Sequence, residues 1–283
     1  MTYKEYSYKN KPDYIQIETT IVCNAKCDFC TQRKVTRRPV KMDEQVWKKI
    51  IDDSRGLGIT YRPFLLNEPF ADDRMLEICK YIKTDKTAKL EFNTNGSLLS
   101  PKITDKLLDI GVEIMRFSID GFFKEEYEKR RKGLDFDTVI SNAEYFCKQA
   151  AGKGIFTEAR MIAFPGSEQE QDLFKKKWSG LASNVLITDL YMYPWEGQTS
   201  SIIKPCLKIR KEMFFYVDGR ATLCCWDTNE RGLIGDVKEQ KVMDIWNGEL
   251  VKKYRKLLDQ GERDKILLCS RCDAYKNLKF DQS

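Results

Sequence analysis

The sequence predicts an α/β fold, a partial (β/α)6 TIM-like barrel followed by a small C-terminal module. Between Tyr14 and Pro194, runs that suit strands alternate with amphipathic stretches that suit helices. The chain has 283 residues, enough for one barrel-like body with an appendage. After Pro194 the pattern changes to short strands and turns. We therefore expect residues 1–194 to form the barrel and residues 195–283 to form the second module.

Six strands are expected in the barrel. Their ranges are Tyr14–Thr19, Tyr61–Leu66, Lys89–Thr94, Glu113–Ile119, Phe156–Ala163 and Val185–Tyr193. Between them, one helix begins after an N-cap at Asp43, and another carries the apolar face of Met75, Ile78, Cys79 and Ile82. One long helix is expected around Met243 to Gln260 in the second module. Since ligands of such barrels bind at the carboxyl ends of the strands, functional residues are expected in the loops that follow them.

The composition excludes several classes of protein. Hydrophobic residues at 42% and charged residues at 33% are typical of a soluble globular protein, and no apolar run approaches the length of about 20 residues that spans a bilayer. The first residues contain no export signal, so we expect a cytoplasmic protein. The absence of histidine excludes Ser-His-Asp triads and Cys-His zinc sites. The net charge of +6 is mixed along the chain, and we infer no nucleic-acid binding from it.

Three of the ten cysteines follow the first expected strand as CNAKCDFC, a CX3CX2C triplet of Cys23, Cys27 and Cys30. In a reducing compartment, clustered thiolates indicate metal ligands or redox groups rather than disulfides. Three thiolates on one loop can bind three irons of a [4Fe-4S] cube and leave the fourth iron open for a reactant. Structural zinc is the alternative, although such a site is normally closed by four protein ligands.

The triplet resembles that of the radical S-adenosylmethionine (SAM) superfamily, and Phe29, just before the third cysteine, also fits. The resemblance implies that the open iron binds SAM and that the reduced cluster cleaves it to a 5′-deoxyadenosyl radical. This radical takes hydrogen from a substrate C–H bond, while the protein orients the reactants. The resemblance also implies an external one-electron reductant such as flavodoxin or ferredoxin.

Further segments resemble SAM-binding motifs of this superfamily. Leu66-Asn67-Glu68-Pro69 is similar to a GGEP segment in which the glutamate contacts the SAM amino group, with two glycines replaced here. Singly, such short segments are also ordinary turns or solvated loops, but their common position after successive strands favours one shared site. The SAM contacts implied by the resemblance are Phe29, Asn67, Glu68, Asn95, Ser118 and Arg131.

A second set of cysteines lies in the C-terminal module: Cys206, Cys224, Cys269 and Cys272. Four thiolates can close either a [4Fe-4S] cluster or a zinc site, and the chemistry alone leaves both open. The segments Phe214 to Gly219 and Ile245-Trp246 resemble the SPASM/Twitch extension of radical SAM enzymes. Only a short tail follows the last cysteine, so the resemblance implies a Twitch-like iron-sulfur domain with one auxiliary [4Fe-4S] cluster.

A closed auxiliary cluster suits electron transfer, which points to a net oxidation. In length and cysteine spacing the chain is similar to radical SAM dehydrogenases that oxidise an alcohol of an aminoglycoside precursor. The resemblance thus implies a dehydrogenase-like oxidation of a small polar molecule, such as a sugar or cyclitol. A radical epimerase or peptide maturase is the alternative among enzymes. A non-catalytic zinc-binding interaction protein is the alternative from another class.

Three residues are candidates for direct roles in the reaction. Cys225, next to an expected ligand, is a packed small residue, an alternate ligand or a thiol that returns hydrogen to a radical, and packing is favoured. Arg160 and Glu196 are candidate proton acceptors in a chain without histidine. The basic stretch from Arg33 to Arg38 is expected to be a solvated loop, with binding of an anionic substrate as the alternative.

Overall fold

The computed structural model describes residues 8–38, 40–190, 206–270 and 272. Within these residues the strands form a single nine-stranded sheet in the order β6-β5-β4-β3-β2-β1-β7-β8-β9. The strands are β1 (Tyr14–Ile17), β2 (Thr60–Arg62), β3 (Lys89–Thr94), β4 (Ile114–Ser118), β5 (Phe156–Ala163), β6 (Asn184–Asp189), β7 (Glu212–Phe215), β8 (Arg220–Thr222) and β9 (Leu233–Asp236). All pairs from β6 to β7 are parallel, whereas β8 pairs antiparallel with both β7 and β9.

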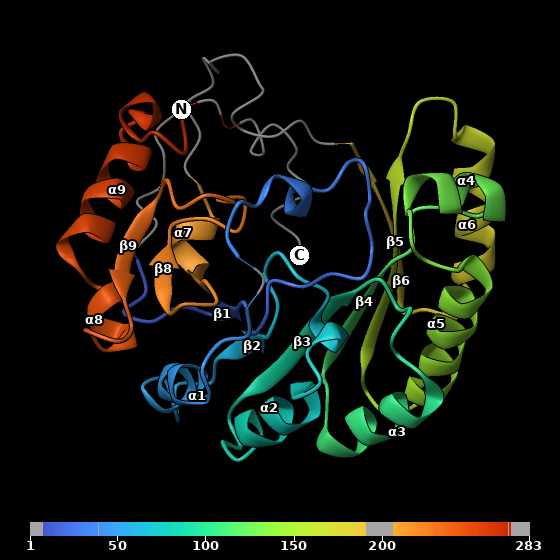
Figure 1. Cartoon of the computed structure of the whole chain (residues 1–283), viewed down its shortest axis with the longest axis horizontal. Coiled ribbons are helices and arrows are strands. Elements are labelled where there is room, and N and C mark those ends of the chain that lie inside the picture. Colours follow the sequence, from blue (N-terminus) through green and yellow to red (C-terminus); the bar gives the residue numbers. More distant parts are fainter. Residues whose placement is uncertain (1–7, 39, 191–205, 271, 273–283) are drawn as a thin grey trace.

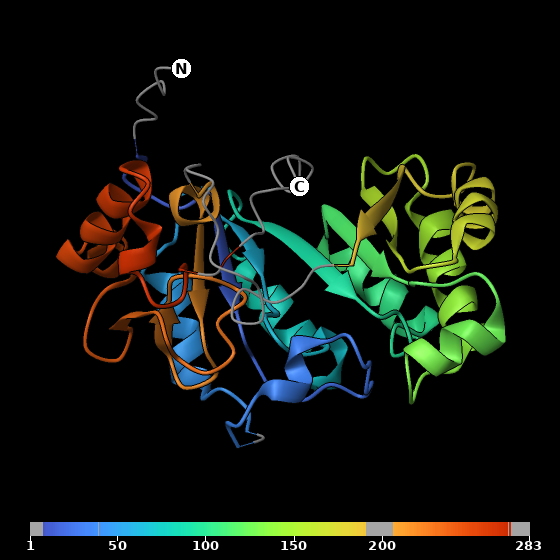
Figure 2. The ribbon, with the colours of Figure 1, turned by 90° about the horizontal axis from the view of Figure 1, so that it is seen from above.

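Helices flank this sheet (Figure 1). They are α1 (Glu44–Asp52), α2 (Met75–Ile82), α3 (Pro101–Ile110), α4 (Lys124–Arg130), α5 (Phe136–Ala150), α6 (Glu168–Trp178), α7 (Lys208–Lys211), α8 (Val242–Trp246) and α9 (Glu249–Asp259). Short 3-10 helices occupy Thr31–Lys34, Pro69–Ala71 and Arg263–Lys265. Seen from above, the C-terminal module lies at one end of the row of strands, and α4 to α6 lie at the other (Figure 2).

The six parallel strands of the predicted partial barrel are confirmed, with differences at their ends. The ranges of β3 and β5 agree with the expected ones. Strand β2 ends at Arg62 and not at Leu66, because Pro63 has no N–H to donate to a neighbouring strand. Strand β6 is described to Asp189, and the end of its expected range, at Tyr193, lies outside the described residues.

The inner face of the sheet differs from its outer face. In β3, Leu90 and Phe92 pack in the hydrophobic core under the helices, while Glu91 and Asn93 line a cavity on the other side. Strands of parallel sheets are usually apolar on both faces, so a charged inner face indicates a functional interior.

The C-terminal module continues the barrel sheet through strand β7. Residues Glu212 to Phe215 of β7 lie in parallel register with Tyr14 to Ile17 of β1. This direct pairing was not part of the sequence-based expectation. The expected single helix from Met243 to Gln260 was wrong: α8 ends at Trp246, and α9 begins at Glu249 after the N-cap Gly248.

Candidate active site

The loop that carries the first three cysteines is held by neighbouring loops at the carboxyl ends of the strands. The backbone N–H of Glu68 donates to Val22 O at 3.1 Å, and Lys26 N–H donates to Lys132 O at 2.7 Å. Gly133 has φ +92°, and a Cβ added there would lie 3.1 Å from Asn24 O. Only glycine fits this close approach, and it allows the loop after α4 to pack closely against the cysteine loop.

Backbone N–H groups contact two of the three sulfurs. Ala25 N–H lies 3.5 Å from Cys23 Sγ and Gln32 N–H lies 3.5 Å from Cys30 Sγ. Burial, together with the charges of Glu68 and the other two cysteines, raises the pKa of Cys23 to about 12. The Cys23 thiol is therefore protonated until a metal displaces its proton.

Glu68 lies buried beside this loop. Its carboxylate accepts from Thr94 Oγ1 at 2.6 Å and from Asn95 N–H at 2.8 Å. Burial raises the pKa of Glu68 to about 7, against the effect of these hydrogen bonds. A cationic group placed here would favour the charged carboxylate.

Two other expected SAM contacts lie near Glu68, and their side chains have different hydrogen-bond partners. The Asn95 side chain holds the cysteine loop, since its Nδ2 donates to Asn24 Oδ1 at 3.0 Å and its Oδ1 accepts from Ser97. Asn67 Oδ1 accepts from Leu65 N–H at 2.9 Å, and its buried Nδ2 has no hydrogen-bond partner among the described residues. Asn67 thus offers an unused donor to a ligand.

Arg131 lies next to the first cysteine set. It forms an ion pair with Asp120, its Nε donating to Asp120 Oδ2 at 2.9 Å, and its Nη1 lies 4.0 Å from Cys27 Sγ. Asp120 has φ +60°, unusual for a residue with a side chain, and its Oδ1 accepts from Ile162 N–H at 2.8 Å. Phe29 packs edge-on against Phe164 with ring centroids 5.3 Å apart. Ser118 ends β4, half-buried.

The second set of cysteines lies in a small apolar cluster of the C-terminal module. Cys206, Cys224 and Cys269 pack against side chains that include Leu223 and Ile266. Burial raises the pKa of Cys269 beyond the range of ordinary thiols, and the charges of Cys206 and Cys272 add to this effect. Cys269 therefore lies within electrostatic reach of Cys206 and Cys272, and Cys224 lies within reach of the same two residues.

The two sets have the numbers of thiols that iron–sulfur clusters need, three for a cluster with an open iron and four for a closed one. Among the described residues, no three Cys, Asp or Glu side chains converge as they would on one metal ion. In a cube each thiolate bonds a different iron, so the ligands stand farther apart than around a single ion. All ten cysteines are free, so none of them is removed from metal binding by a disulfide.

A cavity of about 250 Å³ lies inside the partial barrel, bordered by residues next to a member of each cysteine set. Its lining includes Thr31, which follows Cys30, and Cys225 and Trp226, which follow Cys224. Its remaining lining comes from the inner strand positions Gln16, Arg62, Glu91, Asn93, Arg116 and Arg160, from Phe64, Leu65 and Leu66 and from Lys208. A small molecule bound there would contact residues adjacent to both sets.

The charged side chains around this cavity form a chain of alternating sign. Its order is Lys208, Glu212, Arg62, Glu91, Arg116, Glu158 and Arg160. Arg62 Nε lies 2.9 Å from Glu91 Oε1, and Arg116 Nε lies 3.3 Å from Glu158 Oε1. Such a buried network fixes the positions of the side chains that face the cavity.

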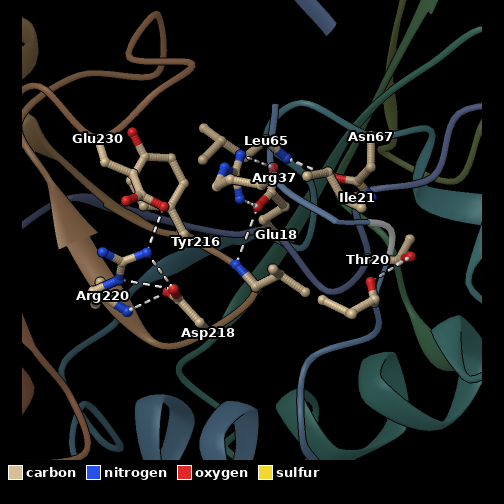
Figure 3. A network of polar contacts seen from close by, with 12 residues as sticks. Glu18, Thr20, Ile21, Arg37, Leu65, Asn67, Tyr216, Asp218, Arg220 and Glu230 are labelled. Atoms are coloured by element: carbon tan, nitrogen blue, oxygen red, sulfur yellow. Dashed lines mark hydrogen bonds and ion pairs between the residues drawn. The ribbon is translucent and has the colours of Figure 1, made fainter. Parts of the chain in front are cut away.

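The basic stretch after the first cysteine set contacts the C-terminal module (Figure 3). Arg37 forms a bidentate ion pair with Glu18, which is fully buried, and its guanidinium lies 4.3 Å from the ring centroid of Tyr216. Glu18 Oε2 also accepts from Val217 N–H at 3.1 Å. The expectation of a solvated loop was therefore wrong for Arg37, which joins the two modules, whereas Arg33 is half-exposed and pairs with Asp28.

Two of the three candidate catalytic residues share the cavity. Arg160 and Cys225 both line it, although they are far apart in the sequence. Arg160 also pairs with Glu158. Cys225 therefore lies on a cavity wall, unlike a side chain enclosed by packing. Glu196 lies outside the described residues.

Sequence reasoning missed Arg62, Glu91, Arg116 and Lys208, which line the cavity, and Asp120, which orients Arg131. The strands KLEFNT and IMRFS do place charged residues at alternating positions, which is a detectable signal. That signal does not say which charges meet, because pairing depends on the register between strands.

Comparison with known proteins supports these features. The sequence profile of the Radical SAM superfamily matches residues 17–175, and that of the SPASM iron-sulfur cluster-binding domain matches residues 206–273. An uncharacterised protein of Methanocaldococcus jannaschii is 26% identical over 192 residues, which are 65% of this chain and 60% of that protein. The S-adenosyl-L-methionine-dependent 2-deoxy-scyllo-inosamine dehydrogenase of Niallia circulans is 21% identical over 271 residues, 92% of each chain.

The fold is also similar to solved structures. BtrN in complex with AdoMet and 2-DOIA superposes with a TM-score of 0.66 at 18% identity, covering 95% of this chain and 94% of that one. None of the helices in the described part of the chain is long and apolar enough to cross a membrane.

Proposed function

The chain belongs to the radical SAM superfamily, and on this premise we propose that it oxidises a small polar substrate at a C–H bond. Membership makes the chain a radical SAM enzyme with [4Fe-4S] clusters and SAM as cofactors. It also argues against the alternative of a non-catalytic zinc-binding interaction protein. In the proposed reaction an alcohol loses a hydrogen atom, a proton and one electron, which leaves a carbonyl group, and the second cluster accepts the electron.

We assign the cluster ligands to the two cysteine sets. Cys23, Cys27 and Cys30 would hold the first cluster, and Cys206, Cys224, Cys269 and Cys272 the second. When bound, the first cluster and SAM supply a 5′-deoxyadenosyl radical that takes the hydrogen atom. Asn67 Nδ2 and the buried Glu68 carboxylate suit the polar groups of SAM, while Arg131 contributes positive charge beside Cys27.

The cavity that borders residues of both cysteine loops is the observation that carries this proposal. A substrate enclosed there would contact Thr31, which follows Cys30, and Cys225, which follows Cys224. At about 250 Å³ it suits a sugar-sized molecule better than a peptide segment, which disfavours a peptide maturase. The named activity of the dehydrogenase from Niallia circulans supports an oxidation. Arg160, on the cavity wall, is our candidate for the proton acceptor.

A radical epimerase is the second candidate, and the position of Cys225 favours it. A thiol on the cavity wall can donate a hydrogen atom to a substrate radical.

The class of enzyme is tested by anaerobic reconstitution with iron and sulfide, followed by dithionite and SAM. We expect about eight irons per chain, two reduced cluster signals in EPR spectra and SAM-dependent 5′-deoxyadenosine. Protein that binds zinc and does not cleave SAM would contradict the proposal.

Replacing Cys225 separates oxidation from epimerisation. If the enzyme is a dehydrogenase, Cys225→Ala and Cys225→Ser retain most product formation, because neither change touches an assigned ligand. An epimerase loses product in both variants and still cleaves SAM, and the wild type incorporates solvent deuterium into the product. Product analysis by mass spectrometry in D₂O distinguishes the two outcomes.

The proposal includes a reducing cellular compartment and an external electron donor. Ten free cysteines and two oxygen-sensitive clusters suit the cytoplasm. Flavodoxin or ferredoxin would supply the single electrons that reduce the first cluster. We propose no nucleic-acid partner.

A further inference from the structure

We propose that the substrate bound in the cavity carries an acidic group, a carboxylate or a phosphate, held by the inward-facing arginines of the barrel. This inference rests on the proposed function, because it takes the cavity as the substrate site. It goes beyond that function by naming the chemical class of the substrate.

The lining of the cavity is strongly basic. Its basic side chains are Arg62, Arg116, Arg160 and Lys208. Among the described residues that line it, Glu91 is the single acidic one. The other carboxylates of the charge network, Glu158 and Glu212, contact the basic groups without lining the cavity. Glu158 and Glu212 thus fix the positions of the basic side chains from outside the cavity. The lining itself carries more positive than negative charge where a ligand would bind.

Two of these arginines are buried with hydrogen-bonding capacity that their ion pairs do not fully satisfy. Arg62 and Arg116 are 6% and 7% exposed, and the Nε of each lacks a hydrogen-bond partner among the described residues although a carboxylate lies within ion-pair distance. Burial and the nearby charge of Arg160 lower the pKa of Arg116 to about 10. An anion between these groups would offset the repulsion and supply the missing acceptors.

The same cavity offers an acceptor for a neutral or cationic part of the substrate. Glu91 Oε2 is buried without a hydrogen-bond partner among the described residues. A buried carboxylate oxygen in this state suits a hydroxyl or ammonium donor. Together with the volume of about 250 Å³, this favours a small hydroxy acid, amino acid or phosphorylated sugar.

The inference is tested with three probes: acetate, acetamide of nearly the same shape without the charge, and inorganic phosphate. Each is titrated by calorimetry into anaerobically reconstituted enzyme saturated with SAM. We expect acetate or phosphate to bind and acetamide not to bind. Arg116→Gln should weaken anion binding about tenfold or more, because it removes charged hydrogen bonds. The control Arg55→Gln, an exposed arginine that pairs with Asp52 outside the cavity, should bind as the wild type does.

Preference for acetate indicates a carboxylate substrate, and preference for phosphate indicates a phosphorylated one. Equal binding of acetate and acetamide, or unchanged anion binding in Arg116→Gln, would overturn the inference. If Arg116→Gln does not fold, as judged by circular dichroism, Lys208→Gln provides the same test at a less buried basic residue of the lining. Iron content and SAM cleavage are measured in the same samples. Protein that cleaves SAM but ignores anions overturns this inference alone, whereas protein without clusters or SAM cleavage overturns the proposed function.

Discussion

Buried ionisable side chains gather where the barrel strands end, and each is held by a particular contact. Glu68 is bound by the hydroxyl of Thr94 and the backbone of Asn95, and Arg131 is bound by Asp120. Asp120, which accepts this hydrogen bond from Arg131, has a left-handed backbone conformation. Such conformations cost free energy and persist where surrounding contacts impose them, as they do at functional sites.

We predict that Glu68 makes stability depend on pH. Its pKa is raised from 4.5 to about 7, so the folded protein retains a proton that the unfolded chain releases. The free energy of unfolding should therefore fall as the pH rises from 4.5 to about 7, by on the order of 3 kcal/mol. Denaturant unfolding of the reconstituted protein without SAM measures this change. Glu68→Gln should lack the decrease and Glu77→Gln, an exposed control, should show it; the same pH dependence in all three proteins would contradict the prediction.

At the scale of elements, the segment from Thr31 to Arg38 joins the first cysteine loop to the C-terminal module. Arg37 pairs with Glu18 and stacks over Tyr216. The backbone N–H of Thr36 donates to Asn229 Oδ1 at 3.3 Å. The same segment begins at Thr31, which lines the cavity together with Cys225 and Trp226 of the C-terminal module.

We expect Arg37→Met to loosen this connection. The change leaves the fully buried Glu18 carboxylate without its cation, which should cost about 3 kcal/mol of unfolding free energy. It should also make residues 31–38 exchange amide hydrogens faster, which mass spectrometry can follow. The matched control is Arg33→Met in the same segment, whose half-exposed ion pair should contribute little. Equal exchange in the two variants would show that Arg37 does not hold the segment.

At the scale of the whole molecule, one continuous sheet relates the two cysteine sets. Because β7 pairs directly with β1, the C-terminal set is fixed relative to the barrel and is not carried on a separate body. The cavity is lined by Thr31 of the barrel and by Cys225 of the C-terminal module. This arrangement suits transfer of an electron from a substrate to the second cluster.

The proposed role of the second cluster can be tested by removing it. The double variant Cys269→Ala/Cys272→Ala should contain about four irons per chain in place of eight. It should still cleave SAM, since the first cysteine loop is not altered, but net oxidation should fall to the background level. A Cys79→Ala/Cys147→Ala variant, which changes two cysteines on helices α2 and α5, is the control and should keep all the iron. Full oxidation by the cluster-depleted variant would exclude the second cluster as electron acceptor.

The sequence by itself determined the features that depend on local spacing. The CX3CX2C triplet, the later cysteines and the alternation of strands with helices predicted the family and the parallel strands, which are confirmed, and a site at the carboxyl ends of the strands, which stays a prediction. These patterns are readable because ligand spacing on one loop and the periodicity of one element involve only residues close in the chain.

Only the tertiary structure decided which distant residues meet. The pairing of β7 with β1, the contact of Arg37 with Glu18 and the charge network around Arg116 depend on register and on how loops fold over one another. A shift of one residue in any strand would turn its charged side chains to the other face. The sequence therefore predicted a radical SAM site after the strands, while the three-dimensional arrangement brought the basic side chains together around one cavity.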